Sequence, residues 1–226
     1  GDVFTTTNVY QFNYNDIVTI QAQPRAGYVF LSWSNGMTNA TEQITILGDH
    51  NISANFDGEP ATLTHQVQSY DIDGITILQG VTGGFISVSA NPPYKFGDPI
   101  EMTSHDEPGF QFDGWLDVNG DLISSSRTLQ LNLEANQTIT AKFKKLSYEV
   151  KIFSAPLVGG TVKADRGTNS QIQTIYVPHG ELVNLQALAS ANYQFEKWVG
   201  NGLESADIFN SQLELAVTQG TPACWC

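Results

Sequence analysis

Three short stretches decide how this chain folds: GYVFLSW at residues 27–33, GFQFDGW at residues 109–115 and NYQFEKW at residues 192–198. Each reads aromatic, any residue, Phe, two residues, Trp, and the three tryptophans lie 82 and 83 residues apart. A constant period in three copies is the signature of a repeat protein. The 226 residues, which by length alone suggest one or two domains, are therefore predicted to form three modules.

Other landmarks keep the same order in each copy and set the predicted boundaries. Before each heptapeptide come a Tyr, a turn and an alternating segment, at residues 14–22, 94–104 and 176–187. Further upstream, the second and third copies have a Gly-Gly pair, and the first copy has none. The predicted modules, of which the first is incomplete at its N-terminal end, are residues 1–57, 61–145 and 147–226. The links between them are only a few residues long, so adjacent modules should touch.

Apolar and polar residues alternate with period two in every module. This alternation over residues 18–22, 129–133 and 183–187 predicts strands with one buried face. Asn-Gly pairs between such runs favour tight hairpin turns, because both residues accept the positive φ angles of those turns. No long segment carries the apolar stripe of a helix. The sequence therefore predicts an all-β protein with at most one short helix per module.

The repeated aromatic residues are the predicted core. A module of ~80 residues is near the lower limit for an independent core, and a Phe and a Trp in each copy supply large apolar areas. The short spacing between them places each pair at a strand end or bulge, with both rings turned inward. The predicted core residues are Phe30, Trp33, Phe112, Trp115, Phe195 and Trp198.

Composition excludes several functions. The chain carries 23 acidic and 10 basic residues, a net charge of −13, which divides into −4, −6 and −3 over residues 1–57, 58–146 and 147–226. It lacks the basic stripe that phosphate groups require, so nucleic acid is not an expected partner. Anionic lipid headgroups would repel the chain, and it has no run of about 18 apolar residues, so direct membrane insertion is not expected.

In this order the landmarks resemble the divergent InlB B-repeat domain, also called the Listeria–Bacteroides type bacterial repeat. The third copy shows the middle of that pattern, YVPHGELVNLQA at residues 176–187, and the second shows its end, ITAKF at residues 139–143. The third copy departs at Asn192, where the motif has Gly, but Asn tolerates positive φ. It also ends in ACWC, which leaves its last strand pairing open, with Trp225 expected near the position of Phe143.

The resemblance implies a small β-rich fold, grasp-like or sandwich-like, without shared catalytic residues. Relatives occur in tandem in large secreted or surface-anchored bacterial proteins, as stalk or spacer modules of adhesins or beside extracellular enzymes. We therefore expect a non-catalytic spacer with no cofactor, located outside a bacterial cell or on its surface. The expected partners are other domains of the same polypeptide, a host or cell-surface protein, or a polysaccharide.

Calcium binding is a further hypothesis. Asp117, Asn119 and Asp121 place oxygen ligands at alternate positions, as the start of a calcium loop does, although the plain interpretation is an Asn-Gly hairpin turn. The acidic turn at Asp71 and Asp73 is a similar candidate.

The alternative function is a carbohydrate-binding accessory module of an extracellular enzyme. Aromatic faces bind sugar rings, but the fixed spacing of each Trp to a Phe favours core packing for the tryptophans. Aromatic residues that do not repeat are better candidates for an exposed platform: Tyr10, Phe12, Tyr70, Phe153 and Phe209.

The only two cysteines, Cys224 and Cys226, stand two apart on a predicted strand. A direct bridge at that separation is strained, so pairing with another chain, pairing with sequence beyond this segment and free thiols all stay open.

Overall fold

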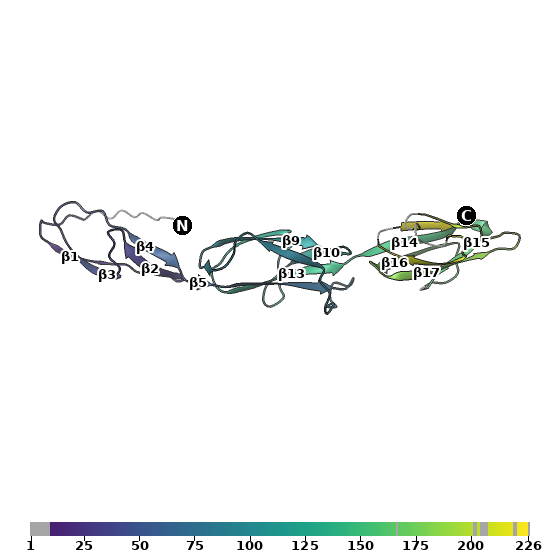
Figure 1. Ribbon diagram of the computed structural model, residues 1–226, viewed down its shortest axis with the longest axis horizontal. Coiled ribbons are helices and arrows are strands. Elements are labelled where there is room, and N and C mark those ends of the chain that lie inside the picture. The colour runs from purple at the N-terminus through teal and green to yellow at the C-terminus, as the bar shows by residue number, and fades with distance from the viewer. Residues whose placement is uncertain (1–9, 166, 201–202, 204–207, 219–220, 226) are drawn as a thin grey trace. The chain divides into compact units, whose positions relative to one another are not determined.

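The computed structural model (Figure 1) describes residues 10–165, 167–200, 203, 208–218 and 221–225. Over these residues it is all-β, as the sequence predicted, with strands β1 to β20 and one 3-10 turn, η1 (Leu157–Gly159). No helix in this described part is long and apolar enough to span a membrane. The chain divides into two compact units. The first consists of residues 1–64, 89–100 and 130–137. The second consists of residues 65–88, 101–129 and 138–226.

The third copy shows a module with two sheets. The strand order of the first sheet is β16 (Ile172–Pro178), β14 (Ser147–Ser154), β20 (Thr221–Trp225), β18 (Trp198–Gly200). In this sheet β14 and β20 run parallel. The strand order of the second sheet is β15 (Gly160–Ala164), β17 (Leu182–Ala189), β19 (Gln212–Ala216).

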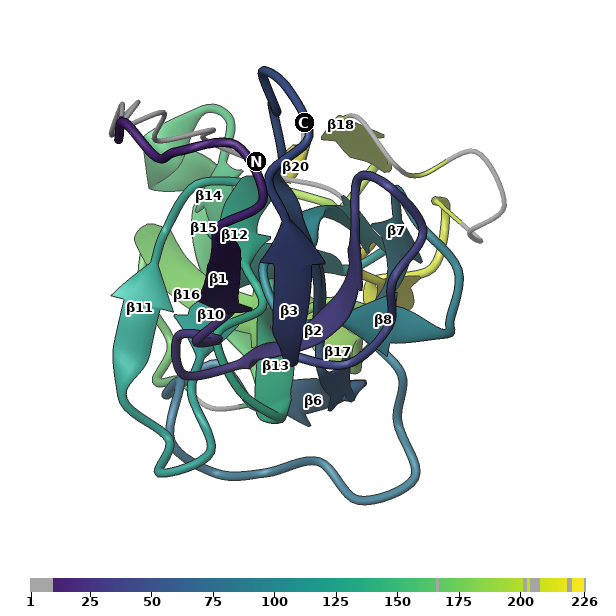
Figure 2. The ribbon, with the colours of Figure 1, turned by 90° about the vertical axis from the view of Figure 1, so that its left-hand side faces the viewer.

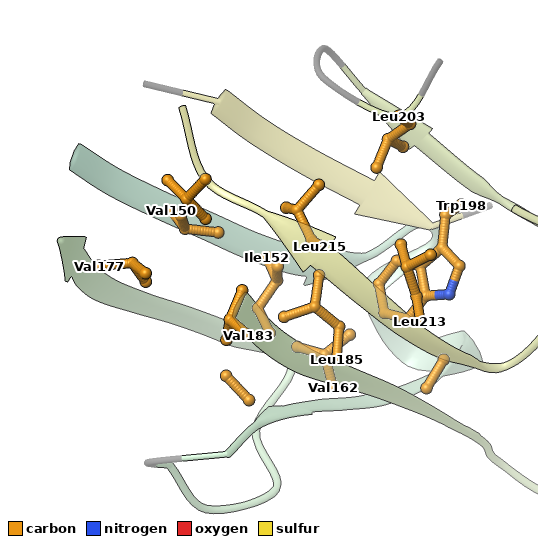
Figure 3. Packing of buried hydrophobic residues seen from close by; sticks show 13 residues of the cluster. Val150, Ile152, Val162, Val177, Val183, Leu185, Trp198, Leu203, Leu213 and Leu215 are labelled. Carbon is orange, nitrogen blue, oxygen red and sulfur yellow. The ribbon is translucent and has the colours of Figure 1, made fainter. Parts of the chain in front are cut away.

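The inward faces of these two sheets share one hydrophobic core (Figure 3). Val150 and Ile152 of β14 pack in the same buried cluster as Val162 of β15 and Leu185 of β17. Alternate residues of each strand supply the core, because successive side chains point to opposite faces of a strand. Two sheets that bury one layer of side chains between them form a β-sandwich, the second of the two forms that the resemblance implied.

The second copy repeats the order of the core strands in both sheets. One sheet has the order β11 (Leu122–Ser124), β10 (Phe110–Leu116), β13 (Gln137–Lys145), β6 (Leu63–Tyr70), and its last three strands match β18, β20 and β14. The other sheet, which matches β19, β17 and β15, has the order β12 (Thr128–Asn132), β9 (Pro99–Asp106), β7 (Gly84–Val88). A short pair, β5 (Pro60–Ala61) with β8 (Tyr94–Lys95), matches the pairing of Ser147 and Tyr148 with β16.

The first copy contains the equivalents of four of these strands. β1 (Ile17–Gln21) pairs with β3 (Thr41–Thr45), and Figure 2 shows the two side by side. β2 (Tyr28–Trp33) pairs with β4 (Ala54–Gly58), as β10 does with β13. Among the described residues 10–58, no strand corresponds to β6 or β7.

In the first and second copies a bulge turns both rings of the repeated Phe–Trp pair inward. In a regular strand, residues three apart point to opposite faces, so Phe30 and Trp33 could not both face the core. The pairing with the neighbouring strand shifts between Phe30 and Ser32, and likewise between Phe112 and Gly114. These shifts are a bulge, one of the two placements that the Phe-to-Trp spacing predicted, and its extra residue reverses the facing of those that follow.

The three conserved Trp side chains lie in nearly identical surroundings. The Phe and Trp ring centroids are 5.5, 5.2 and 5.7 Å apart in the first, second and third copies, at interplanar angles of 57, 59 and 58°. Each indole N–H donates to a backbone carbonyl, that of Asn39, Ser126 or Asn210, at 2.9, 2.8 and 3.0 Å. Each acceptor lies two residues before a strand of the opposite sheet, so one buried side chain ties the two sheets together.

The Gly-Gly landmark makes room for aromatic rings. A Cβ atom on Gly84 would lie 2.3 Å from the ring of Phe143, and one on Gly83 would lie 2.7 Å from the ring of Phe110. The third copy has more room, because a Cβ atom on Gly159 would lie 3.3 Å from the Tyr193 ring. Glycine is needed here because a larger residue would push the ring and the opposing strand apart.

Two details of the third copy answer questions that its sequence left open. Asn192 has a φ of 68°, which confirms that Asn takes this positive-φ corner. In the closing pair, Trp225 lies opposite Trp198, whereas in the second copy Ala141 lies opposite Trp115. Trp225 therefore takes the position of Ala141, two residues from that of Phe143.

Trp115→Phe should lower the free energy of unfolding of the second copy by about 2–3 kcal/mol, because it removes the indole hydrogen bond and leaves part of the ring volume empty. Urea-dependent hydrogen exchange of the β10 and β13 amides would measure this loss. Phe209→Leu, which changes an exposed side chain, should alter stability by less than about 0.5 kcal/mol. Equal losses in the two variants would contradict the role of the Trp115 indole.

Candidate functional site at the joints between copies

The chain passes from one copy to the next through a single residue. Glu59 separates β4 from β5, and Leu146 separates β13 from β14. We call the contacts of residues 27–28, 57–60 and 94–98 joint 1, and those of residues 109, 144–148 and 177–181 joint 2. Each joint lies within one compact unit.

The same two backbone hydrogen bonds hold both joints. In joint 1, Glu59 N–H donates to the Gly27 carbonyl at 2.8 Å, and Phe96 N–H donates to the Glu59 carbonyl at 2.8 Å. In joint 2, Leu146 N–H donates to the Gly109 carbonyl at 2.8 Å, and His179 N–H donates to the Leu146 carbonyl at 2.9 Å. The link residue therefore bonds on one side to the copy it leaves and on the other to the copy it enters.

An aromatic ring of the following copy covers a glycine of the preceding copy in each joint. A Cβ atom on Gly27 would lie 2.4 Å from the Phe96 ring, and one on Gly109 would lie 2.2 Å from the His179 ring. Both glycines have positive φ, 82° and 84°. Glycine is required twice over at this corner, by the backbone angle and by the approach of the ring.

The residue after each ring residue forms a turn with the same hydrogen bonds. Gly97 N–H donates to the Leu133 carbonyl at 2.7 Å, and Gly180 N–H donates to the Val217 carbonyl at 2.8 Å. Both glycines have positive φ, 89° and 78°. The turn thus fixes the ring residue to the core strands of its own copy before that ring meets the neighbouring copy.

Each joint also carries one ion pair. Lys95 pairs with Asp57 in joint 1, and its hydrogen bond lowers the pKa of the Asp57 carboxyl. Lys145 Nζ lies 3.6 Å from Glu181 Oε1 in joint 2. These side chains are partly exposed, so the pairs add little to the stability of the joints. The two backbone hydrogen bonds and the contact between ring and glycine therefore hold adjacent copies together.

The predicted core residues lie in the interior to different degrees. Trp33, Trp115 and Trp198 are buried, and so is Phe112. Phe30 and Phe195 are half-buried. The burial of the three indoles leaves them no face for a sugar ring.

The predicted platform aromatics are scattered. Tyr10 and Phe12 are exposed, with ring centroids 6.2 Å apart and planes tilted by 34°. Phe209 is exposed as well, whereas Phe153 is half-buried. Tyr70 is half-buried beneath Lys142 Nζ, which lies 4.8 Å from the ring centroid. The structure therefore brings only Tyr10 and Phe12 of this set together.

The aspartate side chains of the acidic turns accept hydrogen bonds from backbone N–H groups of the same turn. Asp117 accepts hydrogen bonds from the N–H groups of Asp121 and Asn119, which lower its pKa, the bond from Asp121 contributing most. Within the described residues, no group of three or more His, Cys, Asp or Glu side chains is placed to hold a metal ion. Calcium binding at Asp117, Asn119 and Asp121 stays a prediction.

Cys224 lies in β20, opposite Val199, and Cys226 lies outside the described residues. The question of their pairing therefore stays open.

Sequence reasoning did not identify the joint residues Gly27, Gly109, Phe96 and His179 as a unit. The two glycines fall at the first position of the core heptapeptide, and the ring residues differ between copies. A signal was present: in both copies an aromatic or imidazole side chain directly precedes the glycine of the turn at Gly97 or Gly180.

The repeated sandwich and the repeated joint define a tandem array of small β-modules. The chain belongs to the divergent InlB B-repeat family, because the sequence profile of that domain matches residues 2–60, 76–147 and 159–221. This match confirms the resemblance and its three copies. The family is a bacterial repeat domain that occurs in surface proteins.

Among solved structures, the chain is similar to the Bacillus anthracis TIE protein, with 8% sequence identity and a TM-score of 0.38. The likeness covers 92% of this chain and 50% of that one, so the chain spans half the length of that structure. A likeness this distant says nothing about function. A comparison with curated proteins gave no match.

Gly109→Ala should open joint 2, because the new Cβ would overlap the His179 ring and force it from the corner. We expect faster hydrogen exchange at the Leu146 and His179 amides, measured by NMR. The equivalent amides of joint 1 in the same sample should keep their protection.

Gly120→Ala is the matched control for this experiment. Gly120 has a φ of 86°, close to that of Gly109, but no atom lies within 4 Å of its would-be Cβ. The backbone strain is therefore similar, whereas the ring overlap is absent. Equal acceleration in both variants would show that strain, not the ring contact, governs the joint.

Thr76→Val should raise the pKa of Asp73, which the Thr76 hydroxyl and the N–H groups of Ile75 and Thr76 lower to about 2. A carboxyl whose pKa falls on folding stabilises the fold above its unfolded pKa, and that stabilisation is lost as the pH falls through the folded value. The loss should therefore be smaller in Thr76→Val, and it should be complete at a higher pH. An NMR titration of the carboxyl carbon checks this, and Thr82→Val, in the same loop, should leave the pKa unchanged.

Proposed function

We propose that this chain is a non-catalytic spacer region of a secreted or surface-exposed bacterial protein such as an adhesin. Its task is mechanical: it holds another domain of the same polypeptide at a distance from the cell. The observation that carries this proposal is the joint, which is built twice from the same backbone bonds and the same ring-on-glycine contact.

The design of the joint suits a spacer because it removes free residues between modules. A flexible linker explores many conformations, and the distance it spans varies widely. Here a single residue separates the last strand of one copy from the first strand of the next, and both backbone groups of that residue are hydrogen-bonded. Stiffness then comes from the backbone, so it tolerates sequence differences between copies.

The surface chemistry supports the same proposal. Net charges of −4, −6 and −3 are spread over the three copies, so mild repulsion along the whole chain favours solubility over self-association. The family provides the surface context, because its members occur in bacterial surface proteins.

Pulsed electron spin resonance on the full chain tests the proposal. Spin labels at Thr45→Cys with Ser125→Cys, and at Ser125→Cys with Lys151→Cys, would report the two joints, with Cys224→Ser and Cys226→Ser as background. We expect each distance distribution to be nearly as narrow as that of a pair within the third copy, Lys151→Cys with Glu214→Cys. Broad distributions typical of a flexible linker for both joints would refute a stiff spacer.

A polysaccharide pull-down separates the spacer from the carbohydrate-binding alternative. The spacer should show no saturable binding to any polysaccharide. Saturable binding that disappears in Tyr10→Ala or Phe12→Ala, and persists in Phe209→Ala, would favour an accessory binding module instead.

A further inference from the structure

The outer face of the second sheet of the third copy is hollowed. Strands β15, β17 and β19 turn Val162, Leu185 and Leu213 toward the core, so the residues between such positions face outward. These outward side chains surround a hollow of about 490 Å³, a volume in the range of sites that bind small molecules. We call it the outer hollow, and its polar lining includes Lys163, Asp165, Asn184, Gln186, Gln212 and Glu214.

The strand register arranges this lining in two rows. In the first row Lys163 lies opposite Gln186, and Gln186 lies opposite Gln212. In the second row Asn184 lies opposite Glu214. Strands are about 4.8 Å apart and two residues span about 6.7 Å, so the Cα atoms of Lys163 and Glu214 are about 12 Å apart. An ammonium group and a carboxylate therefore occupy opposite corners of the outer hollow.

Hydrogen bonds hold two other lining groups in place. The backbone N–H and the Nδ2 of Asn184 both donate to Asp165 Oδ2, at 2.9 and 3.2 Å. Asn210 lines the hollow as well, and its Oδ1 accepts a hydrogen bond from the Gln212 N–H at 3.0 Å. Part of the lining is thus already ordered before any ligand arrives.

Three side chains of the outer hollow are free to bind a ligand. Within the part of the chain that the structure describes, the Lys163 ammonium and the Glu214 carboxylate form no ion pair. In the same part of the chain, the carboxamide of Gln186 forms no hydrogen bond. Two opposite charges and a group that both donates and accepts are therefore left without a partner.

The fold does not require these charges, because the second copy lacks them. Lys163 corresponds to Ser87, since each stands three residues after the second glycine of the Gly-Gly landmark. Glu214 corresponds to Gln130, since each is the third residue of its strand, β19 or β12. The same order of core strands thus forms with neutral residues at both corners, which leaves the two charges available for recognition.

The lining excludes several classes of ligand. A phosphate-rich ligand would meet the carboxylates of Asp165 and Glu214 on a copy whose net charge is −3. A neutral sugar would cover two charged groups without pairing either of them, which is unfavourable. No group of three or more His, Cys, Asp or Glu side chains within the described residues could hold a metal ion there. The ligand that fits carries one charge of each sign.

We propose that the outer hollow binds a short peptide with an ammonium group at one end and a carboxylate at the other. Lys163 pairs with the carboxylate, and Glu214 pairs with the ammonium group. The carboxamides of Asn184, Gln186 and Gln212 bind the peptide groups between them, because a carboxamide and a peptide group each donate and accept. Three extended residues span about 10 Å, which matches the diagonal between the two corners. This inference does not depend on the spacer function, because it concerns one face of a single copy.

Trialanine with free ends is the probe, and the full chain is the receptor. An NMR titration should show saturable shifts of the β15, β17 and β19 amides, whereas the equivalent amides of β7, β9 and β12 should stay unchanged. Acetylation of the amino end, or amidation of the carboxyl end, removes one charge of the peptide. Each change should weaken binding about three- to fivefold, because the ion pairs are partly exposed.

Two variants that introduce the residues of the second copy test the assignment of the two corners. Lys163→Ser should bind trialanine about three- to fivefold more weakly and should no longer distinguish the free carboxyl end from the amidated one. Glu214→Gln should lose the distinction between the free and the acetylated amino end. Both side chains face outward, so the melting temperature should stay the same. Lys151→Ser, which removes a charge from the other sheet of the same copy, should keep the original affinity.

Four results would overturn the proposal. The first is the absence of saturable shifts at trialanine concentrations up to about 20 mM, beyond which a complex is too weak to be specific. The second is equal affinity for trialanine and for the peptide with both ends blocked. The third is unchanged discrimination between the peptide ends in Lys163→Ser and Glu214→Gln. The fourth is the same set of shifts from cellotriose, which would mean that the outer hollow recognises hydroxyl groups and not charged ends.

Discussion

The indole of the conserved Trp is the interaction on which each module depends. Its N–H donates across the sandwich to a carbonyl that leads into the opposite sheet, and its ring packs on the Phe three residues earlier. In the first two copies, where both aromatic residues lie in one strand, this geometry requires a bulge between them, because otherwise one of them would face solvent. The heptapeptide therefore determines which side chains of its strand point into the core. It also determines how deep that core is and where the second sheet lies. Small modules need such concentrated anchoring, since their cores contain few residues.

The joints depend on a different kind of constraint, one of backbone geometry. Glu59 and Leu146 share no chemistry, and neither do Phe96 and His179 beyond a flat ring, yet both joints have the same bonds. What repeats is the absence of a side chain at Gly27 and Gly109 and the positive φ of the turn at Gly97 and Gly180. A contact made from main-chain atoms leaves the side chains free to diverge, and the exposed ion pairs of the two joints do differ in their residues.

These two kinds of constraint explain how much the sequence could reveal. The Phe and Trp pair carries large side chains at fixed spacing, so three copies, an all-β fold and the bulge could all be predicted. The joints could not be predicted, because their hydrogen bonds are made by backbone atoms, which are the same in every residue type. The register of β20 could not be predicted either, because the final ACWC differs from the ITAKF that closes the second copy.

The parallel pairing of β14 with β20 has a mechanical consequence. The chain enters the third copy at Ser147, at one end of this strand pair, and β20 runs in the same direction beside β14. Tension applied at the two ends of the copy therefore slides the strands past each other and loads the five paired positions from Val150 to Ser154 together. An antiparallel hairpin pulled from its open end would instead lose its inter-strand hydrogen bonds one after another. A copy built in this way resists force in shear, the stronger of the two directions in which a β-sheet can be pulled.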